Sequence, residues 1–322
     1  MTMETRNGYL LRQRTQQDHD ENGKNCCNCQ KRVVQQQQET VEPHPTTLNP
    51  QQQTSLKVDS LHLRVSFRFF AIATTCLPLL SMFFCFVTSM IFQFDQVNHT
   101  FCKVQNFIPS ISAITGIAPQ RYVWRVCIGL HSTPRFLVAF MYWNYFLTQM
   151  RHVAPEHRSI FKVLLRITFW LNVTENACLI GVTYVSNVEN YPLHEKIFIV
   201  FMVASIAYMI LHSYLFKWSY GPDPTPTQLK SLKLKLYMLT LVCISTAGLL
   251  YFFYKHRVYC EPGAFSWFSF SEYGIAAFSI SYHFTGYLEF SGSSFLLGTV
   301  APSAPVSPAA VDTKARCAEK KL

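Results

Sequence analysis

Charged residues are scarce in this chain of 322 residues, where Asp, Glu, Lys and Arg together make up 14%. A soluble globular protein carries roughly 25%, and here hydrophobic residues reach 49%. Glycine is scarce as well, with 12 residues against 27 phenylalanines. The missing charge argues against an ordinary soluble domain, and the low glycine content argues against a turn-rich β protein. The composition favours long helices with lipid-facing side chains.

Familiar catalytic and metal-binding signatures are also absent from the sequence. It has no pair of CxxC motifs of the zinc type, no GxSxG elbow, no HExxH motif and no Walker loop. We therefore predict neither a metal nor a cofactor. Spacing alone identifies no reaction.

Six apolar segments occupy the middle of the chain, and the hydrocarbon core of a membrane needs roughly 20 residues of helix to cross it. The segments cover residues 69–94, 122–150, 167–188, 197–216, 236–254 and 264–288. We predict an all-α integral membrane protein, a bundle of six transmembrane helices over residues 61–290. The polar, Gln-rich residues 1–60 and the Ser/Pro/Ala-rich residues 291–322 are expected to be disordered cytosolic tails. The first tail has no apolar h-region of a cleaved signal peptide, and its Cys26, Cys27 and Cys29 indicate either an inert tail or palmitoylation.

The distribution of Lys and Arg predicts the orientation of the bundle. On one side of the six segments lie 15 Lys and Arg residues, against 6 on the other. Basic residues concentrate in cytoplasmic loops, so both termini are expected in the cytosol. This bias explains the net charge of +10 without a nucleic-acid partner.

Two features of the expected lumenal loops can be checked. Cys102 and Cys260 are the only cysteines in these loops. Because the lumen is oxidising, we predict that they pair, the alternative being two unpaired thiols. Asn98 begins the sequon Asn98-His99-Thr100, which predicts N-glycosylation.

Several ionisable residues lie inside the expected spans, where they are costly and usually face a bundle interior. At 1.5 Å per residue, Arg135 and Glu175 both lie roughly 20 Å from the lumenal ends of their helices, and His131 and Glu272 lie at roughly 12–14 Å. We predict an Arg135–Glu175 ion pair and a polar cavity that opens toward the lumenal leaflet. The pair is alternatively structural only, and His131 is alternatively a packing residue.

The mouth of this cavity is expected to be basic. Arg121 and Arg125 are four residues apart and share a helix face, so they would suit a lipid phosphate or else sit among anionic headgroups. The expected substrate-binding residues are Arg121, Arg125, Arg135, Glu175 and Asn176.

Residues 119–144, PQRYVWRVCIGLHSTPRFLVAFMYWN, resemble the post-GPI-attachment-to-proteins factor 2 family. Shorter matching stretches lie at residues 171–176, 183–186, 194–195 and 259–263, and the resemblance covers about residues 61–290. A wider group includes the damage-regulated autophagy modulators, which are also six-span proteins. The residues that match the family pattern include Cys102, His131, Arg135, Glu175, Asn176 and Cys260.

The resemblance implies a role in remodelling the lipid of glycosylphosphatidylinositol (GPI) anchors in the Golgi membrane, with the endoplasmic reticulum membrane as the alternative. There an unsaturated acyl chain is removed and a saturated one is installed, and the family is associated with the reacylation of lyso-GPI. The implied partners are membrane lipids, GPI-anchored proteins and lyso-GPI, and the acyl donor is left open.

For an acyltransferase, His131 is the candidate base for the lysolipid hydroxyl and Glu272 would orient it. Arg125 and Arg135 would hold a phosphate or a developing oxyanion. Two alternatives to an enzyme stay open. The chain either presents or flips GPI lipids or scaffolds a separate acyltransferase, or it is a regulator in the lysosomal or plasma membrane.

Overall fold

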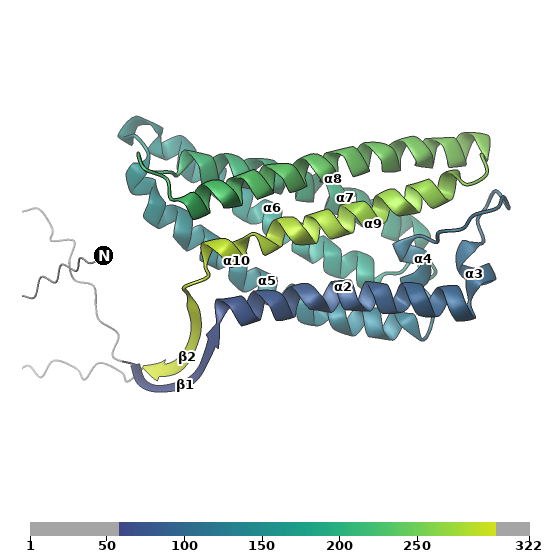
Figure 1. Cartoon of the computed structure of the whole chain (residues 1–322), viewed down its shortest axis with the longest axis horizontal. Coiled ribbons are helices and arrows are strands. Elements are labelled where there is room, and N and C mark those ends of the chain that lie inside the picture. Colours follow the sequence, from purple (N-terminus) through teal and green to yellow (C-terminus); the bar gives the residue numbers. More distant parts are fainter. Residues whose placement is uncertain (1–57, 301–322) are drawn as a thin grey trace, which may run out of the picture. The chain divides into compact units, whose positions relative to one another are not determined.

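The computed structural model describes residues 58–300, with side-chain environments for residues 62–296. Most of the two expected tails, including Cys26, Cys27 and Cys29, lies outside this range. Within it, six helices of 21 to 34 residues follow one another and alternate in direction (Figure 1). They are α2 (Phe67–Phe92), α5 (Gln120–Gln149), α6 (Arg158–Tyr184), α7 (Tyr191–Trp218), α8 (Pro226–Tyr259) and α9 (Ala264–Phe284).

Short elements mark the two ends of the bundle. We call the end with α3 (Phe94–Asn98) and α4 (Ile111–Thr115) the disulfide end, because Cys102 and Cys260 are bonded there. We call the opposite end the tail-side end (Figure 1). It holds the 3-10 turns η2 (Met150–His152) and η3 (Pro155–His157), the short α10 (Gly286–Glu289), and the strands β1 (Val58–Ser66) and β2 (Ser294–Val300).

The strands β1 and β2 are the main departure from the expected architecture. They pair antiparallel, with Ser66 opposite Ser294 and Arg64 opposite Leu296. Residues 294–300 were expected to begin a disordered tail, and residues 61–66 to belong to the helical domain. Residues 61–66 alternate apolar and polar side chains, a strand pattern that was missed in the sequence, and residues 294–300 pair with them.

Local sequence explains where several helices begin and end. Thr225 and Gln228 form a capping box at the start of α8, with Pro226 in its first turn. Asn190 caps α7 by accepting a hydrogen bond from the Leu193 N–H. The turn from α8 to α9 needs positive φ at Cys260 (50°) and Gly263 (76°), and glycine adopts that conformation readily.

Close packing of α8 against α9 depends on small residues. A Cβ atom added at Gly248 would lie 2.9 Å from the Ser271 Oγ, and one added at Gly274 would lie 2.8 Å from the Ser245 Oγ. Small side chains allow two helix backbones to approach closely where lipid supplies no hydrophobic driving force between them. The two helices therefore meet along their length, as Figure 1 shows.

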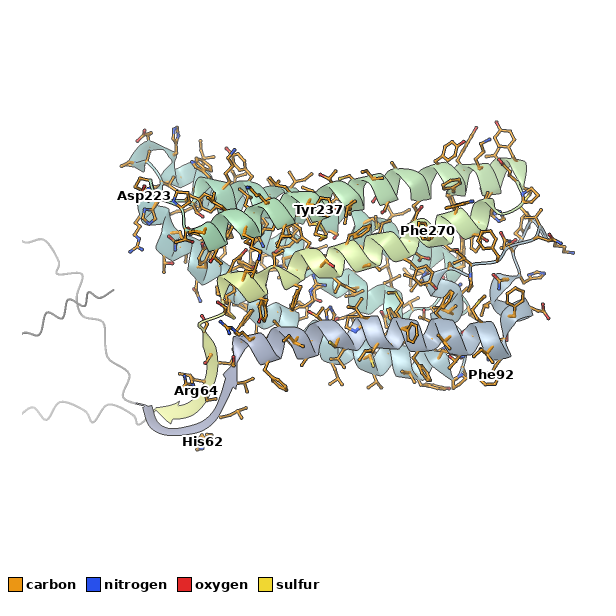
Figure 2. All side chains as sticks on the ribbon, in the orientation of Figure 1. His62, Arg64, Phe92, Asp223, Tyr237 and Phe270 are labelled. Carbon is orange, nitrogen blue, oxygen red and sulfur yellow. A yellow bond between two sulfur atoms is a disulfide. The ribbon has the colours of Figure 1, made fainter. Side chains whose placement is uncertain are left out.

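Four helical segments of the described range are long and apolar enough to cross a membrane, namely α2, residues Pro155–Tyr184, α7 and α8. Large apolar side chains such as Phe92, Tyr237 and Phe270 are exposed on the bundle (Figure 2). Exposed apolar surface on this scale marks contact with lipid. The expected class, a helical multi-pass membrane protein, is thereby confirmed. The helices α5 and α9 are long enough to span but less apolar, because α5 carries three arginines and α9 carries five serines and Glu272.

An aromatic core fills the tail-side end of the bundle. Buried rings from four elements meet there, including Phe67, Tyr142, Phe146, Phe161 and Phe216. This packing leaves little space at the tail-side end.

A buried ion pair lies within the aromatic core. The Lys235 Nζ is 2.9 Å from the Glu289 Oε1, and the two side chains are only 1% and 2% exposed. The rings of Tyr142, Phe216 and Tyr282 lie 5.2–5.6 Å from the ammonium. Lys235 is one of the 15 basic residues from which the orientation was predicted, and it was taken as a charge of a cytosolic loop. That placement is wrong. It is a buried side chain of α8 that bonds to α10.

Candidate functional site

A cavity lies inside the bundle toward the disulfide end, between α2, α5, α6, α7 and α9, and beside α4. The volume of the cavity is about 900 Å³, which includes the space at its open side. Its wall is mostly apolar, and its polar groups are Ser112, Thr115, His131, Arg135, Thr183, His194, Glu272, Ser279 and His283. A mostly apolar pocket with a few convergent polar groups is the usual form of a ligand site.

Arg135 and Glu175 are paired deep in the bundle. The Arg135 Nη2 is 3.0 Å from the Glu175 Oε1, and the glutamate side chain is fully buried. The Ser205 Oγ donates to the same oxygen at 3.3 Å. Arg135 borders the cavity, whereas Glu175 lies behind it. The depth estimate from sequence therefore located a real contact.

His283 joins this pair, although its place near the cytosolic end of the last expected span predicted an interfacial side chain. Its Nε2 lies 2.9 Å from the Glu175 Oε1 and 2.8 Å from the Arg135 Nη2. One ring nitrogen cannot both donate to the carboxylate and accept from the guanidinium, so the protonation of His283 decides which bond is made. The sequence signal for His283 was its position on the same α9 stripe as Glu272 and Ser279.

His131 is held by a backbone carbonyl of a neighbouring helix. Pro78 lacks an N–H, so the Thr74 carbonyl four residues earlier has no partner within α2. The His131 Nδ1 donates to that carbonyl at 2.7 Å. A carbonyl only accepts, so Nδ1 carries the hydrogen and Nε2 is the nitrogen free to take a proton.

Glu272 does not orient His131, in contrast to the expectation. Its Oε2 accepts a hydrogen bond from the Ile111 N–H at 2.8 Å, which holds the first turn of α4 against α9. Both side chains border the cavity, as their matched depths predicted. The residue that orients His131 is Thr74, which depth estimates for ionisable side chains do not reveal.

Asn176 lies outside the cavity wall. Its amide Nδ2 donates to the Ser132 carbonyl at 2.8 Å, and the side chain is buried between α5 and α6. The contact joins these helices behind Arg135. The expected role in substrate binding therefore has no direct geometric support.

Arg121 and Arg125 form a separate cluster at the disulfide end. Arg125 Nη2 lies 2.6 Å from the Glu189 Oε2, and Arg121 Nη1 lies 3.6 Å from the Glu189 Oε1. Arg121 also donates to the Gly116 carbonyl, and Arg125 to the Tyr184 carbonyl. Neither guanidinium borders the cavity. The structure therefore does not bring these arginines to the cavity wall, and Glu189 offsets part of their charge.

Glu189 is held as a carboxylate by its neighbours. The Ser186 N–H and the Arg125 guanidinium both donate to it, and these bonds lower its pKa from 4.5 to about 2. Sequence reasoning missed this residue because a loop glutamate is unremarkable until two arginines lie beside it.

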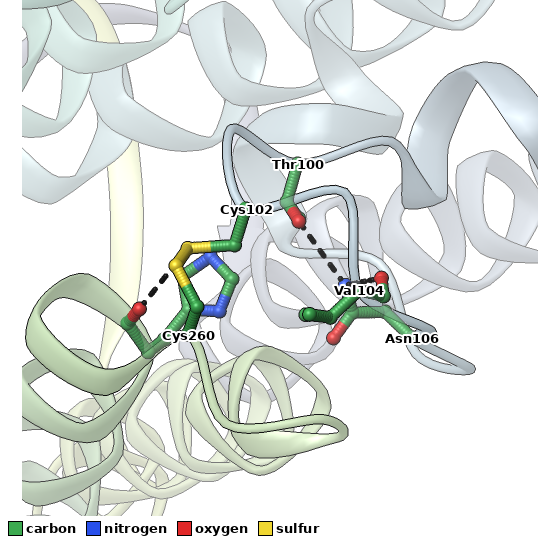
Figure 3. Close-up of a disulfide and its surroundings, with 6 residues drawn as sticks. Thr100, Cys102, Val104, Asn106 and Cys260 are labelled. Carbon is green, nitrogen blue, oxygen red and sulfur yellow. Dashed lines mark hydrogen bonds between the residues drawn. A yellow bond between two sulfur atoms is a disulfide. The ribbon is translucent and has the colours of Figure 1, made fainter.

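Cys102 and Cys260 form a disulfide that links the loop after α3 to the end of α8 (Figure 3). The same loop is folded on itself by hydrogen bonds from Asn106 to Thr100 and to the Val104 carbonyl (Figure 3). The bond requires an oxidising compartment to persist.

Asn98 is poorly placed as a glycan acceptor. Its side chain is 8% exposed, and its Nδ2 donates to the Phe94 carbonyl at 3.0 Å within α3. Thr100, the third residue of the sequon, is equally buried. A glycan needs an exposed amide nitrogen, so the folded loop argues against the expected modification.

A second histidine of the cavity was not selected as a site residue from the sequence. The His194 Nε2 lies 2.9 Å from the Ser112 Oγ, and both residues border the cavity. The two are 82 residues apart. The only sequence signal was that residues 194–195 match the family resemblance.

Comparison with known proteins yields several relatives over the helical region. The chain is 47% identical over 230 residues to post-GPI attachment to proteins factor 2-like of Drosophila melanogaster, covering 70% of each chain. It is 35% identical over 234 residues to a Xenopus tropicalis protein named acyltransferase PGAP2, covering 72% of this chain and 90% of the relative. Post-GPI attachment to proteins factor 2 of Caenorhabditis briggsae is 35% identical over 238 residues, 73% of this chain and 89% of the relative. No solved structure matches the chain.

These relatives confirm the resemblance carried by residues 119–144. Residues 66–293 match the family model described as the Frag1/DRAM/Sfk1/Cwh43P N-terminal domain. This range begins at the end of β1 and ends just before β2, so it contains all six long helices and the cavity between them. The chain is thus a member of the Frag1/DRAM/Sfk1/Cwh43P family.

Proposed function

We propose that this chain acts in the lipid remodelling of GPI anchors after their attachment to proteins, by reacylating lyso-GPI with a saturated fatty acid. The relatives are named for post-GPI attachment, and one is named an acyltransferase. The single observation that carries the proposal is the cavity, which combines an apolar wall with histidine, arginine and carboxylate groups inside the bundle. A lipid substrate has the same two parts, an acyl chain and a polar headgroup. Its partners are membrane lipids, lyso-GPI and GPI-anchored proteins.

In this proposal all six long helices cross the membrane. The helix α9, the shortest, has 21 residues, or about 32 Å at 1.5 Å per residue, which matches a hydrocarbon core of about 30 Å. Of the three arginines that make α5 less apolar, Arg135 bonds to Glu175 inside the bundle. The other two lie at the disulfide end, paired with Glu189. Pairing lowers the cost of an ionisable side chain within a membrane.

Orientation follows from the two ends. The disulfide supports a lumenal position for its end. Nine of the 15 counted basic residues lie at the tail-side end within the described part of the chain, once Lys235 is set aside, and an excess of basic residues is typical of the cytoplasmic side. Both termini would then be cytosolic and the cavity would serve the lumenal leaflet. The Golgi membrane is the proposed location, with the endoplasmic reticulum membrane as the alternative.

The cavity groups have complementary roles in this chemistry. Arg135 supplies positive charge for a lipid phosphate or a developing oxyanion. His131 has Nε2 free, because Nδ1 donates to the Thr74 carbonyl. In a direct transfer from donor to acceptor, His131 is the base that takes the proton of the lysolipid hydroxyl. Glu272 acts indirectly, by holding α4 in place beside the cavity.

The proposal is tested with the purified full-length chain in nanodiscs that contain lyso-GPI. Two saturated acyl donors are supplied separately, phosphatidylcholine and palmitoyl-CoA, and the reacylated lipid is measured by mass spectrometry. We expect transfer from one donor, lowered at least about 100-fold in His131→Ala. The matched control is His99→Ala, since His99 is an exposed histidine in the loop after α3.

The same experiment defines failure. A folded chain that transfers from neither donor would overturn the enzymatic role, and rescue of GPI remodelling in cells would then support the presenting or scaffolding role. Full transfer by His131→Ala would remove that residue from the mechanism while leaving the acyltransferase proposal in place.

A further inference from the structure

Ser112 and His194 meet at the edge of the cavity from different elements. Ser112 lies in the first turn of α4, and His194 in the first turn of α7. The Ser112 Oγ is 2.9 Å from the His194 Nε2. Both residues border the cavity, so the contact lies where a bound lipid would reach it.

The orientation of the His194 ring is defined by a third group. Its Nδ1 lies 2.7 Å from the Val185 carbonyl at the end of α6. A carbonyl oxygen only accepts hydrogen bonds, so Nδ1 carries a hydrogen. In the neutral ring, Nε2 then holds the lone pair and accepts the hydroxyl hydrogen of Ser112. A nucleophile bonded to a base that is itself oriented by a third group is the arrangement of an activated serine.

Ser112 differs from three serines of α9. The hydroxyls of Ser269, Ser271 and Ser281 each donate to a carbonyl four residues earlier in their own helix, which is an ordinary way to satisfy a buried hydroxyl. Ser112 instead bonds to a histidine 82 residues away. Its neighbour Ile111 is held by Glu272, so the serine is positioned from two sides.

The cavity wall also contains a hydroxyl with a hydrogen left to donate. Thr183 borders the cavity, is 4% exposed, and its Oγ1 has no hydrogen-bond partner in the described part of the chain. It lies two residues before Val185, whose carbonyl orients His194. A buried hydroxyl without a partner is costly unless a ligand completes it. Thr183 is therefore a cavity-wall hydroxyl whose hydrogen is not taken up by another described group.

We propose that Ser112 is a nucleophile that carries the acyl group as a covalent ester, with His194 as its base. This inference rests on the proposed acyl transfer and divides it into two steps. In the first step, the Ser112 Oγ gives its proton to the His194 Nε2 and attacks the carbonyl carbon of a long-chain acyl donor. The bond from that carbon to the donor's leaving oxygen or sulfur breaks. The leaving group takes the proton from His194.

The second step returns the enzyme to its starting state. The hydroxyl of lyso-GPI gives its proton to the His194 Nε2, and its oxygen attacks the carbonyl carbon of the Ser112 ester. The bond to the Ser112 Oγ breaks, and Oγ takes the proton back from His194. In this two-step route His194 carries out the proton transfers. His131, in the cavity wall, binds the acceptor lipid.

The donor is an activated acyl carbonyl, either the oxygen ester of a phospholipid or the thioester of an acyl-CoA. The experiment separates these sources. The full chain in nanodiscs is given alkyne-labelled saturated phosphatidylcholine or alkyne-labelled palmitoyl-CoA, without lyso-GPI. The denatured protein is then coupled to a fluorophore and its labelled peptides are identified by mass spectrometry. We expect label on Ser112 from one of the two donors, and its loss when lyso-GPI is added.

Variants distinguish a nucleophile from a structural contact. Ser112→Ala is expected to lose the label and at least about 100-fold of transfer, and His194→Gln to lose both similarly. Ser112→Cys keeps a nucleophile and is expected to be labelled through a thioester that neutral hydroxylamine cleaves. The control Ser269→Ala, a buried serine outside the cavity wall, should keep both label and transfer.

Two outcomes would overturn the proposal. One is a wild-type chain that transfers acyl groups while no label reaches Ser112. The other is transfer by Ser112→Ala within about threefold of wild type. In either case acyl transfer itself stands. His131→Ala separates the two routes directly, because the two-step route predicts that it still forms the Ser112 ester but passes little of it to lyso-GPI.

Discussion

The two ends of the bundle are held together in different ways. At the tail-side end, aromatic rings pack closely and enclose the Lys235–Glu289 ion pair. At the disulfide end, a smaller apolar cluster around Cys85, Val97 and Ile114 is present, and the cavity occupies part of the remaining interior. There the chain is held by the Cys102–Cys260 bond and by partly exposed ion pairs around Glu189. Where the cavity reduces the packing between helices, the disulfide and the ion pairs help to stabilise the structure.

The same contrast separates the two buried ion pairs. Lys235 and Glu289 are almost fully buried, and neither borders the cavity. Arg135 and Glu175 lie between the two ends, and Arg135 borders the cavity. For Lys235 and Glu289 the loss of water is offset only by protein groups, which include the Thr285 and Ser231 hydroxyls and three aromatic rings. A pair beside a cavity can also meet water or a ligand headgroup. The first is a structural element and the second is available for function.

The largest effect is expected at the Lys235–Glu289 pair. Lys235→Met leaves Glu289 buried without a counter-charge and should lower the free energy of unfolding by about 3–5 kcal/mol. Lys235→Met combined with Glu289→Leu should restore most of that loss, because an apolar pair can replace a buried ion pair. Thermal unfolding of the purified protein measures both. The control is Lys233→Met, an exposed lysine of the same helix. Equal losses in the single and double variants would contradict this account.

The disulfide is expected to come next. Its two cysteines are 158 residues apart in sequence, so breaking it frees a long loop in the unfolded state. Replacing both with serine should lower the free energy of unfolding by about 2–4 kcal/mol. Hydrogen exchange should rise at the disulfide end and stay unchanged in the aromatic core of the tail-side end. Cys76→Ser, at an exposed free cysteine, serves as the control. Uniform loosening of both ends would argue against the contrast drawn here.

A smaller stability effect but a large functional one is expected at Arg135–Glu175. Glu175→Gln should cost about 1–3 kcal/mol, less than Lys235→Met, because the cavity lets water reach Arg135. Replacing both residues with methionine should recover stability without recovering acyl transfer. Unfolding and transfer are measured on the same preparation. A double variant that transfers normally would make this pair structural, like its counterpart.

The smallest effect is expected at Glu189 and depends on pH. Its pKa falls from 4.5 to about 2 on folding, first through the hydrogen bond from the Ser186 N–H and then through Arg125. Its stabilising contribution is therefore complete above about pH 4.5 and is lost as the pH falls toward 2. Glu189→Gln should be slightly less stable than wild type at pH 7, and this difference in stability should vanish near pH 2. A difference that does not change across this range would show that the carboxylate charge contributes nothing.

The sequence by itself determined the helices and the depth of their charged residues. Long apolar runs require helices, because a membrane offers no hydrogen-bond partners to an open backbone. A constant rise per residue then predicted that Arg135 and Glu175 lie at the same level, and the structure pairs them. The depth of a residue along a helix does not tell toward which side of the helix it points. Asn176 was therefore expected to bind substrate, whereas it bonds to the Ser132 carbonyl outside the cavity wall.

Contacts that depend on loops and on the rotation of helices were decided only by the tertiary structure. Ser112 reaches His194 because the segment between α3 and α5 brings α4 within hydrogen-bond distance of the first turn of α7. His131 meets Thr74 because Pro78 leaves a carbonyl free on the neighbouring helix. The sequence predicts that Lys235 is a loop charge, whereas the structure pairs it with Glu289 of α10. Each contact joins residues distant in sequence, and no local propensity encodes such a meeting, because it depends on how every helix packs at once.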